Sequence, residues 1–520
     1  MQLTYALKRS ALLFGDTPAL IDSDGKWTYA ELLERVRKTA GMLQGLGVGA
    51  EDTVAILMLN SHWYLELMFG GIWAGGVIVP LNTRLAPPEL IFQMNDCKTK
   101  VLVIDDAFVP MLEAFEGKLD SVEHILYCGD GDLPPGCKSF KELQAQADAV
   151  ADAGRGGDDL MGIFYTGGTT GRAKGVMLSH GNVIANSVNG LIALGYKHTD
   201  TYLHVAPMFH LADAGTTWIF TMCGGCHAFL PGFDPEATLK AIQDYKVTKI
   251  ILVPTMINMI VNHPSIDDYD LSSLQTILYG ASPIPIAVLE KALSMLDCDF
   301  VQGYGMTESS QIVSILPAQD HLHPADSPLR ERLKSCGQAL TLTEVEVRDD
   351  NDNEVPRREV GEICFKGPNV MQGYLNMPDA TAEALKGGWM HSGDVGYMDE
   401  HGYIYLVDRS KDMIVSGGEN VYSVEVEAAI YTHPAVLEAA VIGIPHAEWG
   451  EAVHAVVVLK PGQSASEDEL IKHCKELIAG FKCPKSIVFQ DGELPKSGAG
   501  KILKRDLREP YWEGEERGIH

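Results

Sequence analysis

A glycine- and threonine-rich segment at residues 165–175 directly follows a short apolar run at residues 162–164. Within eleven residues it carries four glycines, three threonines and the cations Arg172 and Lys174. Glycines let a backbone curl until its N–H groups converge on an anion, and threonine hydroxyls add further donors. A strand that leads into such a loop predicts a phosphate-binding turn. A flexible surface loop is the alternative interpretation.

The phosphate loop of kinases and GTPases has the pattern Gly-x-x-x-x-Gly-Lys-Ser/Thr, which neither glycine-rich segment of this chain matches. In the first segment Lys174 is followed by Gly175, where a hydroxyl residue is required. A second segment at residues 498–502 ends in Ile502 at the position of the Mg²⁺-binding hydroxyl. The phosphate site must therefore be of another kind.

The 520 residues are too many for one hydrophobic core and suggest roughly two to four domain-sized units. A net charge of −29 argues against a nucleic-acid surface and against anionic membranes. The longest uncharged run, residues 67–82, is interrupted by glycines and Pro80 and falls short of roughly twenty apolar residues, so no membrane span is expected. Residues 1–16 lack a signal-peptide core, and a cytoplasmic enzyme is expected.

Apolar runs alternate with amphipathic stretches through most of the chain. Buried strands are expected at residues 101–104, 250–253 and 276–279. A helix over residues 29–44 is predicted by the capping box of Thr28 and Glu31 and by Gly45 behind it. Strands alternating with helices indicate an α/β fold with largely parallel sheets.

Between about residues 343 and 406 the pattern changes to short strands with Gly and Asp turns, which predicts a small β-subdomain. A boundary near residues 408–412 divides the chain into an N-terminal domain, 1–409, and a C-terminal domain, 410–520, of about 110 residues. In the C-terminal domain strands are expected at residues 413–415, 436–444 and 453–459, helices at 423–431 and 467–477, and a mobile tail from Glu509. The expected fold is α/β: a large N-terminal domain with parallel-type sheets, helices and a β-subdomain, and a small mobile α+β domain.

Ten cysteines are scattered without a disulfide rhythm. The fragment at residues 223–227, Cys-Gly-Gly-Cys-His, invites a metal or redox interpretation, but no second Cys or His pair stands at zinc-finger spacing. Buried thiols in a glycine-rich turn are therefore expected there. His321 and His323 are expected on a solvated loop.

Four further segments, together with residues 165–175, resemble the motifs of the adenylate-forming superfamily in order and spacing. They are residues 279–283, 302–308, 389–394 and 495–501. Within that superfamily the chain resembles the AMP-forming acyl-CoA synthetases, or fatty (carboxylic) acid–CoA ligases. The resemblance extends from about residue 16 to residue 508. Agreement of all these motifs makes it specific at the superfamily level.

The resemblance implies a nucleotide site in which Tyr304 stacks on the base, Thr307 binds the α-phosphate and Glu308 holds Mg²⁺. An aromatic face, a neutral donor and a hard carboxylate suit these roles. Asp394 and Arg409 would bind the ribose. The implied ATP- or AMP-binding residues are Thr166, Gly167, Gly168, Thr169, Thr170, Gly171, Lys174, Gly280, Ala281, Ser282, Gln302, Gly303, Tyr304, Gly305, Thr307, Asp394, Arg409 and Lys501.

Lys501 corresponds to the superfamily's lysine that bridges the substrate carboxylate and the α-phosphate. A cation is needed there because two anions must meet. The implied catalytic residues are Lys501, Thr307, Glu308 and His210, with Glu308 as the metal ligand. Rotation of the small domain about the hinge residue Lys411 would then withdraw Lys501 and present a CoA-binding loop. The residues of that loop are Gly417, Gly418, Glu419 and Asn420.

The positions that correspond to the acyl pocket are His210, Ala212, Leu278, Ala281, Gly303, Gln311 and Ile312. They are mostly small or aliphatic, which favours a fairly open apolar pocket. Asp213 is a polar exception, for which exposure to solvent is the simplest interpretation. Val415 and Asn420 replace the lysine and glutamine that are usual in plant-type coumarate–CoA ligases, which argues against a hydroxycinnamate.

The implied reaction has two halves: ATP·Mg²⁺ and a carboxylate give an acyl-adenylate and pyrophosphate, and the CoA thiol then displaces AMP. We expect a medium-chain, branched or aryl-substituted acid, with a short thioether acid such as methylthiopropionate as an alternative. A standalone amino-acid-adenylating enzyme, a luciferase-like oxidative activity and a nucleotide-binding regulator without catalysis remain open. The expected partners are the carboxylate, ATP and CoA, without nucleic acid. The sequence does not decide the oligomeric state and leaves a homodimer open.

Overall fold

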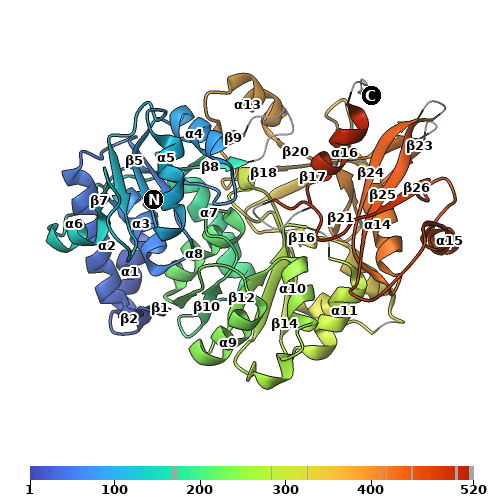
Figure 1. The fold of residues 1–520 in the computed structure, drawn as a ribbon, viewed down its shortest axis with the longest axis horizontal. Helices are drawn as coiled ribbons and strands as arrows, with labels where there is room; N and C mark the ends of the chain where they lie inside the picture. Colours follow the sequence, from blue (N-terminus) through green and yellow to red (C-terminus); the bar gives the residue numbers. More distant parts are fainter. Residues whose placement is uncertain are drawn as a thin grey trace.

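The structure is a computed structural model that describes residues 1–166, 173–282, 284–324, 326–409, 412–416, 419–446, 449–497 and 502–513, without the side chains of residues 408, 409 and 419. Two large sheets with their helices form most of the N-terminal part (Figure 1). A four-stranded sheet leads from them to the C-terminal domain, which lies on the right in Figure 1.

A nine-stranded sheet carries one half of the N-terminal part. Its strand order is β16 (Gln338–Ala339), β15 (Ser314–Leu316), β14 (Asp299–Tyr304), β13 (Thr276–Gly280), β12 (Lys249–Leu252), β10 (Thr201–His204), β11 (Cys226–Phe229), β1 (Pro18–Asp22) and β2 (Gly25–Thr28). The central pairs from β14 to β1 are parallel, and the outer pairs are antiparallel. The carboxyl ends of β13 and β14 therefore meet at one edge.

An eight-stranded sheet carries the other half. Its order is β19 (Gly373–Tyr374), β9 (Lys174–Ser179), β8 (Leu160–Thr166), β4 (Val77–Pro80), β3 (Thr53–Leu57), β5 (Thr99–Ile104), β6 (His124–Tyr127) and β7 (Lys138–Ser139). Only β9 pairs antiparallel, with β8 and with β19. The uncharged run at residues 67–82 forms the end of a helix followed by β4.

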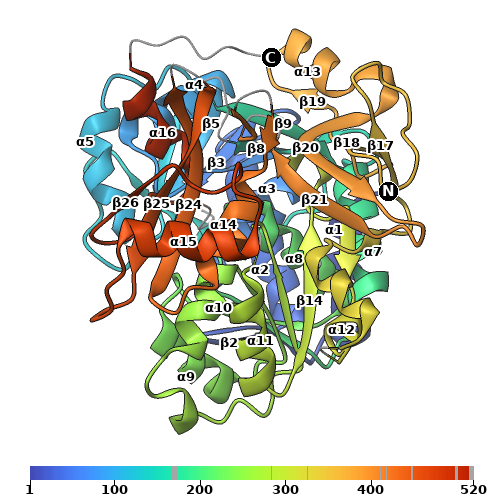
Figure 2. The same ribbon diagram turned by 90° about the vertical axis from the view of Figure 1, so that its right-hand side faces the viewer.

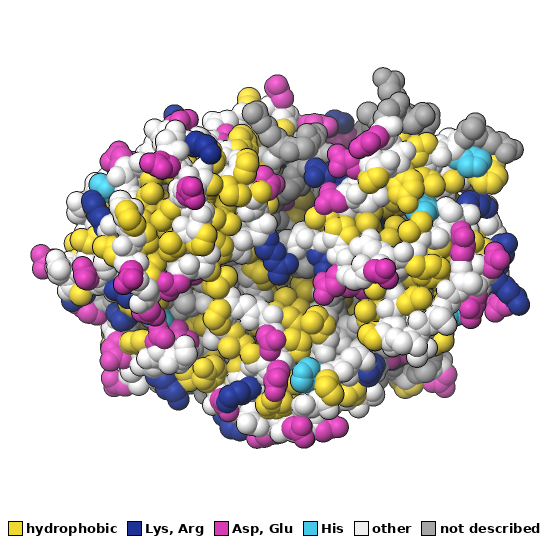
Figure 3. Space-filling view, viewed as in Figure 1, with side chains coloured by type: hydrophobic (Ala, Val, Ile, Leu, Met, Phe, Trp, Pro, Cys, Tyr) yellow, Lys and Arg dark blue, Asp and Glu magenta, His cyan; other side chains and the backbone are white. Residues whose placement is uncertain are grey.

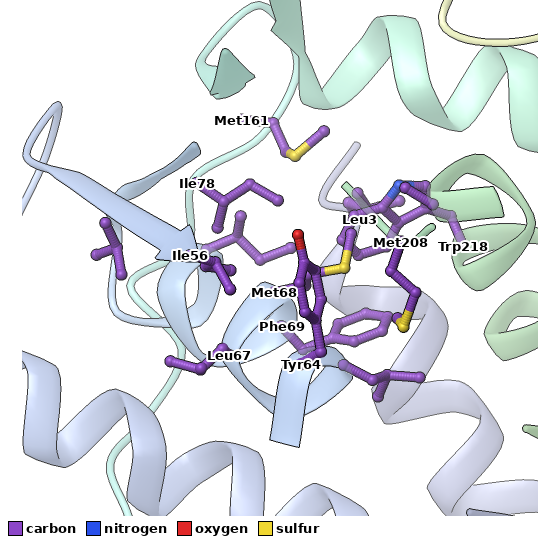
Figure 4. Close-up of a cluster of buried hydrophobic side chains, with 14 of the residues drawn as sticks. Leu3, Ile56, Tyr64, Leu67, Met68, Phe69, Ile78, Met161, Met208 and Trp218 are labelled. Atoms are coloured by element: carbon purple, nitrogen blue, oxygen red, sulfur yellow. The ribbon is translucent and has the colours of Figure 1, made fainter. Parts of the chain in front are cut away.

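Helices cover both sheets, and several of them share one core. Their bounds are α1 (Thr4–Phe14), α2 (Tyr29–Gly45), α3 (His62–Trp73), α4 (Pro87–Asp96), α5 (Leu112–Phe115), α6 (Phe140–Gln146), α7 (His180–Leu194), α8 (Leu211–Cys223), α9 (Pro235–Tyr245), α10 (Pro254–Val261), α11 (Ile286–Met295), α12 (Ala318–His321) and α13 (Pro378–Ala384). Figure 4 shows part of that core, where Tyr64 and Phe69 of α3 lie beside Trp218 of α8 and Ile56 of β3. This apolar packing fixes α8 relative to both sheets.

A four-stranded antiparallel sheet follows, in the order β17 (Glu344–Arg348), β18 (Gly361–Lys366), β20 (Met390–Met398) and β21 (Ile404–Arg409). The C-terminal domain contains β22 (Ile414–Ser416), β23 (Glu419–Val421), α14 (Ser423–Tyr431), β24 (Val436–His446), β25 (Gly450–Leu459), α15 (Glu467–Leu477), β26 (Ser486–Phe489) and α16 (Lys504–Trp512). The expected β-subdomain and the elements of the small domain are present.

The C-terminal sheet has an apolar core on each of its two faces. Val453, Ala455 and Val457 of β25 pack in one cluster with α14 and α15, which lie in front of the sheet in Figure 2. The alternate residues Val456 and Val458 pack in a second cluster, to which α16 contributes. Such alternation follows from the two-residue period of a strand.

Several expectations at the level of single elements can be compared with the structure. The expected capping box of α2, with Thr28, is present, and α15 begins with a second capping box, at Ser466. The expectation of a mobile tail from Glu509 is wrong as far as residue 512, because α16 extends to Trp512, whose indole N–H donates to the Gly443 carbonyl. The division at residues 409 and 410 stays a prediction. None of the helices in the described part of the chain has the length and apolar character that a membrane crossing needs.

Candidate active site

Two glycines at the ends of adjacent strands form the floor of the candidate nucleotide site. Gly280 of β13 is in register with Gly303 of β14. A Cβ at Gly280 would lie 2.2 Å from the Gly303 carbonyl oxygen, so no larger residue fits there. The next residue, Ala281, is exposed and has φ +64°, a backbone conformation that turns the chain sharply away from the strand. Ser282 follows and is half-buried.

The turn after β14 is equally tight. A Cβ at Gly305 would lie 1.9 Å from the Gln311 carbonyl oxygen, so this position also requires glycine. Gln302 and Gly303 are half-buried on the same strand end. Close approach of the backbone leaves the strand ends free of bulky side chains, as a bound nucleotide requires.

Tyr304 and Asp394 are brought together from positions ninety residues apart in the chain. The Tyr304 hydroxyl donates to Asp394 Oδ2 over 2.8 Å, and burial together with that carboxylate raises the pKa of the phenol. Asp394 is 8% exposed. On the neighbouring strand it is in register with Arg409, whose backbone alone is described. The residues expected to bind base and ribose thus lie in direct contact.

Thr307 and Glu308 lie in a 3-10 turn, Thr307–Ser309, that follows β14. Glu308 is 6% exposed, and its Oε1 accepts a hydrogen bond from the Tyr374 hydroxyl over 2.8 Å. The Lys174 ammonium lies 4.7 Å from the centroid of the Tyr374 ring. Tyr374 therefore bridges the expected metal ligand and the cation that ends the glycine-rich segment.

The donor set around Glu308 fits Mg²⁺. A buried carboxylate is a hard oxygen ligand, and Mg²⁺ in nucleotide sites is usually held by one or two carboxylates, with substrate phosphates and water completing the octahedron. Thr307, directly before it, supplies a neutral hydroxyl at the same turn.

The glycine-rich segment is described only at its two ends. Thr166 closes β8 and pairs in register with Lys174, which opens β9. Gly167, Gly168, Thr169, Thr170 and Gly171 lie outside the described residues. The hairpin nevertheless brings Thr166 and Lys174 together at one sheet edge.

His210 caps the N-terminus of α8. Its Nδ1 accepts a hydrogen bond from the Ala212 N–H over 3.1 Å, and burial lowers the pKa of the imidazole to about 4. The ring is therefore neutral at pH 7, with its proton on Nε2. A neutral imidazole can donate a hydrogen bond from Nε2 to a carboxylate.

Gln311 attaches the turn after β14 to α8. Its Nε2 donates to the Ala212 carbonyl over 2.8 Å and to Thr216 Oγ1 over 3.2 Å. Leu278 and Ile312 belong to one buried apolar cluster, and Ala212 packs against it. Among the expected acyl-pocket residues, His210, Ala212 and Gln311 therefore lie at the N-terminal half of α8, and Gly303 lies next to Leu278.

The expectation that Asp213 faces solvent is wrong. Its side chain is fully buried, and its carboxylate accepts hydrogen bonds from the Tyr202 hydroxyl over 2.8 Å and from His204 Nδ1 over 2.6 Å. His204 Nε2 in turn lies 2.9 Å from His227 Nδ1. The sequence does not reveal this, because β10 and β11 bring the two histidines together only in the sheet. His321 is also buried, against Tyr279, and not on a solvated loop.

The segment that leads to Lys501 lies against the N-terminal part. Arg84, in the loop after β4, donates from its guanidinium to the Ser497 carbonyl over 3.2 Å. Lys496 is fixed by ion pairs to Glu438 (2.6 Å) and Glu493 (2.9 Å). Lys501 itself and Lys411, the expected hinge residue, lie outside the described residues.

The expected CoA loop is described only at its end. Asn420 is exposed on β23, Gly417 and Gly418 lie outside the described residues, and the side chain of Glu419 is not described. In Figure 1, β23 lies at the outer edge of the C-terminal domain, well away from β8 and β9. The structure thus places residues 495–497, and not β23, toward the nucleotide site.

The surface is hollowed between the N-terminal part and the C-terminal domain, and both Lys or Arg and Asp or Glu side chains border this hollow (Figure 3). Tyr374 and Arg84 were not expected from the sequence. The only local pattern that could have indicated a role for Arg84 was its position as a lone cation after an uncharged strand. No local pattern indicated a role for Tyr374.

Comparison with known proteins gives consistent matches over almost the whole chain. Residues 7–375 match the AMP-binding enzyme family, and residues 425–501 match the AMP-binding enzyme C-terminal domain. A feruloyl-CoA synthase of Amycolatopsis sp is 42% identical over 93% of this chain and 94% of its own length. A long-chain-fatty-acid–CoA ligase of Escherichia coli O6:H1 is 35% identical over 98% and 94%. ATP-bound MatB from Rhodopseudomonas palustris superimposes with a TM-score of 0.88, at 31% identity and coverage of 99% and 100%.

Proposed function

Since this chain belongs to the AMP-binding enzyme family and is an AMP-forming acid–thiol ligase, we propose that it converts an aryl-substituted or medium-chain carboxylic acid into its CoA thioester. The observation that carries the site assignment is the contact of Tyr304 with Asp394 beside the Glu308–Tyr374–Lys174 arrangement. These groups suit the base, ribose, metal and phosphates of one ATP molecule.

In the first half-reaction a carboxylate oxygen of the acid attacks the α-phosphorus, and pyrophosphate leaves. Thr166, Lys174 and Thr307 would bind the phosphates, and Lys501 would lie between the two anions that must meet. Mg²⁺ held at Glu308 would neutralise charge on the phosphates. Neutral His210 would orient the carboxyl group.

In the second half-reaction the CoA thiol sulfur bonds to the acyl carbon, the carbon–oxygen bond to AMP breaks, and the thiol proton is lost. The arrangement around Arg84 and Ser497 suits adenylation, because it turns residues 495–497 toward the nucleotide site. Thioester formation would require rotation about Lys411 to bring residues 417–420 there instead.

The acid is inferred from the pocket and from the relatives. Ala212, Leu278, Ile312 and Gly303 are small or apolar, which suits an aromatic ring or an alkyl chain. The relative at 42% identity is named for feruloyl-CoA, which favours an aryl acid. Val415 and Asn420, which argued against a hydroxycinnamate, are in register on the β22–β23 hairpin of the C-terminal domain, so they do not line the acyl cluster.

The proposal is tested by AMP release from ATP with a panel of arylpropenoates, benzoates, straight-chain acids, short thioether acids and amino acids, each with and without CoA. We expect sustained AMP release only with CoA, and a preference for an aryl or medium-chain acid. Turnover that ignores CoA, or release from amino acids alone, would contradict it.

A further inference from the structure

The apolar cluster at the acyl site continues along the whole of α8, well beyond the residues expected to line the pocket. This cluster, here called the tail cluster, includes Tyr196, Tyr202, Phe220, Ile251, Leu278 and Ile312. Ala212 and Cys223 of α8 both pack against it. The two residues are eleven positions apart on the helix, or about 16 Å.

The tail cluster lies between α8 and one face of the nine-stranded sheet. Ile251, Leu278 and Val301 are in register on three adjacent strands and form an apolar row on that face. On the helix, Ala212, Ile219 and Cys223 recur at helical spacing, so they share the face that is turned toward the row. An acyl tail that enters beside His210 would therefore run between α8 and the sheet, toward Phe220.

A surface pocket of about 600 Å³ opens at the far end of the same helix. It lies between α1, α7 and the loop after α7, and its lining is mostly apolar. Leu191, Tyr196 and Cys223 line this pocket and also belong to the tail cluster or pack against it. The tail cluster thus extends from Ala212 at the acyl site to the lining of the surface pocket.

Aromatic rings separate these two ends. The centroids of Tyr196 and Phe220 are 4.8 Å apart, and those of Phe220 and Tyr202 are 5.1 Å apart. Tyr196 is 6% exposed and Phe220 and Tyr202 are fully buried. Phe220 is held tightly, because a Cβ at Gly225 would lie 2.6 Å from its Cδ1. Tyr196 is the member of this group that faces the surface pocket.

We propose that the Tyr196–Phe220 pair is the distal wall of the acyl pocket and sets the upper limit on the length of the acid. This inference rests on the proposed function and adds to it the residues that determine tail length. In the wild type the wall ends the pocket within the length of α8. Removal of the Tyr196 ring would open this wall beside Phe220 toward the surface pocket, whose apolar lining would then receive the end of a longer tail.

The test compares wild type, Tyr196→Ala and the matched control Tyr5→Ala on straight-chain acids from butanoate to hexadecanoate. Tyr5 lines the outer side of the surface pocket and is 57% exposed, so its loss opens the pocket without removing the wall. For Tyr196→Ala we expect the acid with the highest kcat/KM to be a longer one. The kcat/KM of longer acids should rise roughly fourfold for each methylene that becomes newly buried. The control should keep the wild-type optimum.

Phe220→Leu is the second variant, because it thins the same wall with a smaller loss of packing in case Tyr196→Ala does not fold. Thermal unfolding and turnover of the best short acid show that each variant is intact. If folded, active variants keep the wild-type length optimum, the proposal that Tyr196 and Phe220 limit the length of the acid is wrong, while the ligase activity is unaffected. A wild type that makes no acyl-CoA from any acid would overturn the proposed function and this inference together.

Discussion

The Asp213 carboxylate accepts a hydrogen bond from Nδ1 of His204 over 2.6 Å, at a place where neither side chain has any exposed surface. The contact continues through His227 to the Thr221 hydroxyl, 3.1 Å from His227 Nε2. One choice of tautomers satisfies every link of this chain. Burial and the neighbouring His204 lower the pKa of His227, which keeps that ring neutral. This row of hydrogen bonds connects both ends of α8 to β10 and β11.

Asp213→Ala should therefore destabilise the protein strongly. Removing one partner leaves buried polar groups without compensation, and we expect the free energy of unfolding of the N-terminal part to fall by about 3–5 kcal/mol. Urea unfolding followed by tryptophan fluorescence measures it. Asp270→Ala, at an exposed ion pair with Lys246, is the matched control and should cost far less, because solvent screens exposed charges. Equal losses in the two variants would contradict this account.

His180 predicts a pH dependence of stability. It is 1% exposed, and burial lowers its pKa from 6.5 to about 4. Between these values the unfolded chain binds a proton that the folded His180 does not, so stability is complete above pH 6.5 and declines as the pH falls toward 4. The loss amounts to about 3 kcal/mol at pH 4. His180→Gln should reduce the slope of the stability curve over this range, to which His210 and His227 also contribute, whereas the exposed His401→Gln should not. A slope that His180→Gln leaves unchanged would assign the dependence to other groups.

Arg84→Ala should separate the two half-reactions. The guanidinium holds the Ser497 carbonyl, and its loss should slow pyrophosphate release by roughly tenfold, as one charge-assisted hydrogen bond. Conversion of a supplied acyl-adenylate to acyl-CoA should be unaffected. Arg357→Ala, also at an exposed arginine, serves as control. A parallel loss in both halves would mean that Arg84 acts on substrate binding and not on the orientation of the C-terminal domain.

Lys501→Ala should abolish most adenylation while ATP still binds. Loss of the single cation between carboxylate and phosphate should lower the rate of pyrophosphate release by about 10²–10³. Calorimetric titration with ATP measures the binding that should persist. Lys472→Ala, at an exposed lysine of the same domain, should behave as wild type. Wild-type pyrophosphate release by the Lys501 variant would show that the assignment of this lysine is wrong.

Tyr374→Phe should lower the affinity for Mg²⁺. The hydroxyl orients the Glu308 carboxylate, and loss of such a supporting contact typically costs 10–100-fold in metal affinity. The Mg²⁺ concentration for half-maximal pyrophosphate release should rise accordingly, with little change at saturation. Tyr397→Phe, in the β-subdomain, is the control. An unchanged Mg²⁺ dependence would remove Tyr374 from the site.

The sequence predicted what local chemistry decides. A capping box is made by residues three positions apart, so it can be recognised in the sequence. The boxes of Thr28 with Glu31 and of Ser466 with Glu469 both mark the start of a helix. The strand expected at residues 276–279 is present, and Gly280 at its end has a local steric cause.

Contacts between distant segments were not predictable. Asp213 looked exposed because its partners, His204 and His227, come from strands whose pairing no local pattern reveals. Tyr374 reaches Glu308 across sixty-six positions and carries no motif of its own. Arg84 meets Ser497 only because two domains lie side by side.

The two-sided core of the C-terminal sheet has a consequence for how this protein can vary. Its apolar clusters draw on residues of that domain alone in the described part of the chain. Folding of this unit is therefore independent of the angle at which it sits on its larger neighbour. Substitutions at the interface can therefore change the angle between the domains without lowering the stability of the C-terminal domain. Selection can act separately on the relative rates of the two half-reactions and on the stability of this domain.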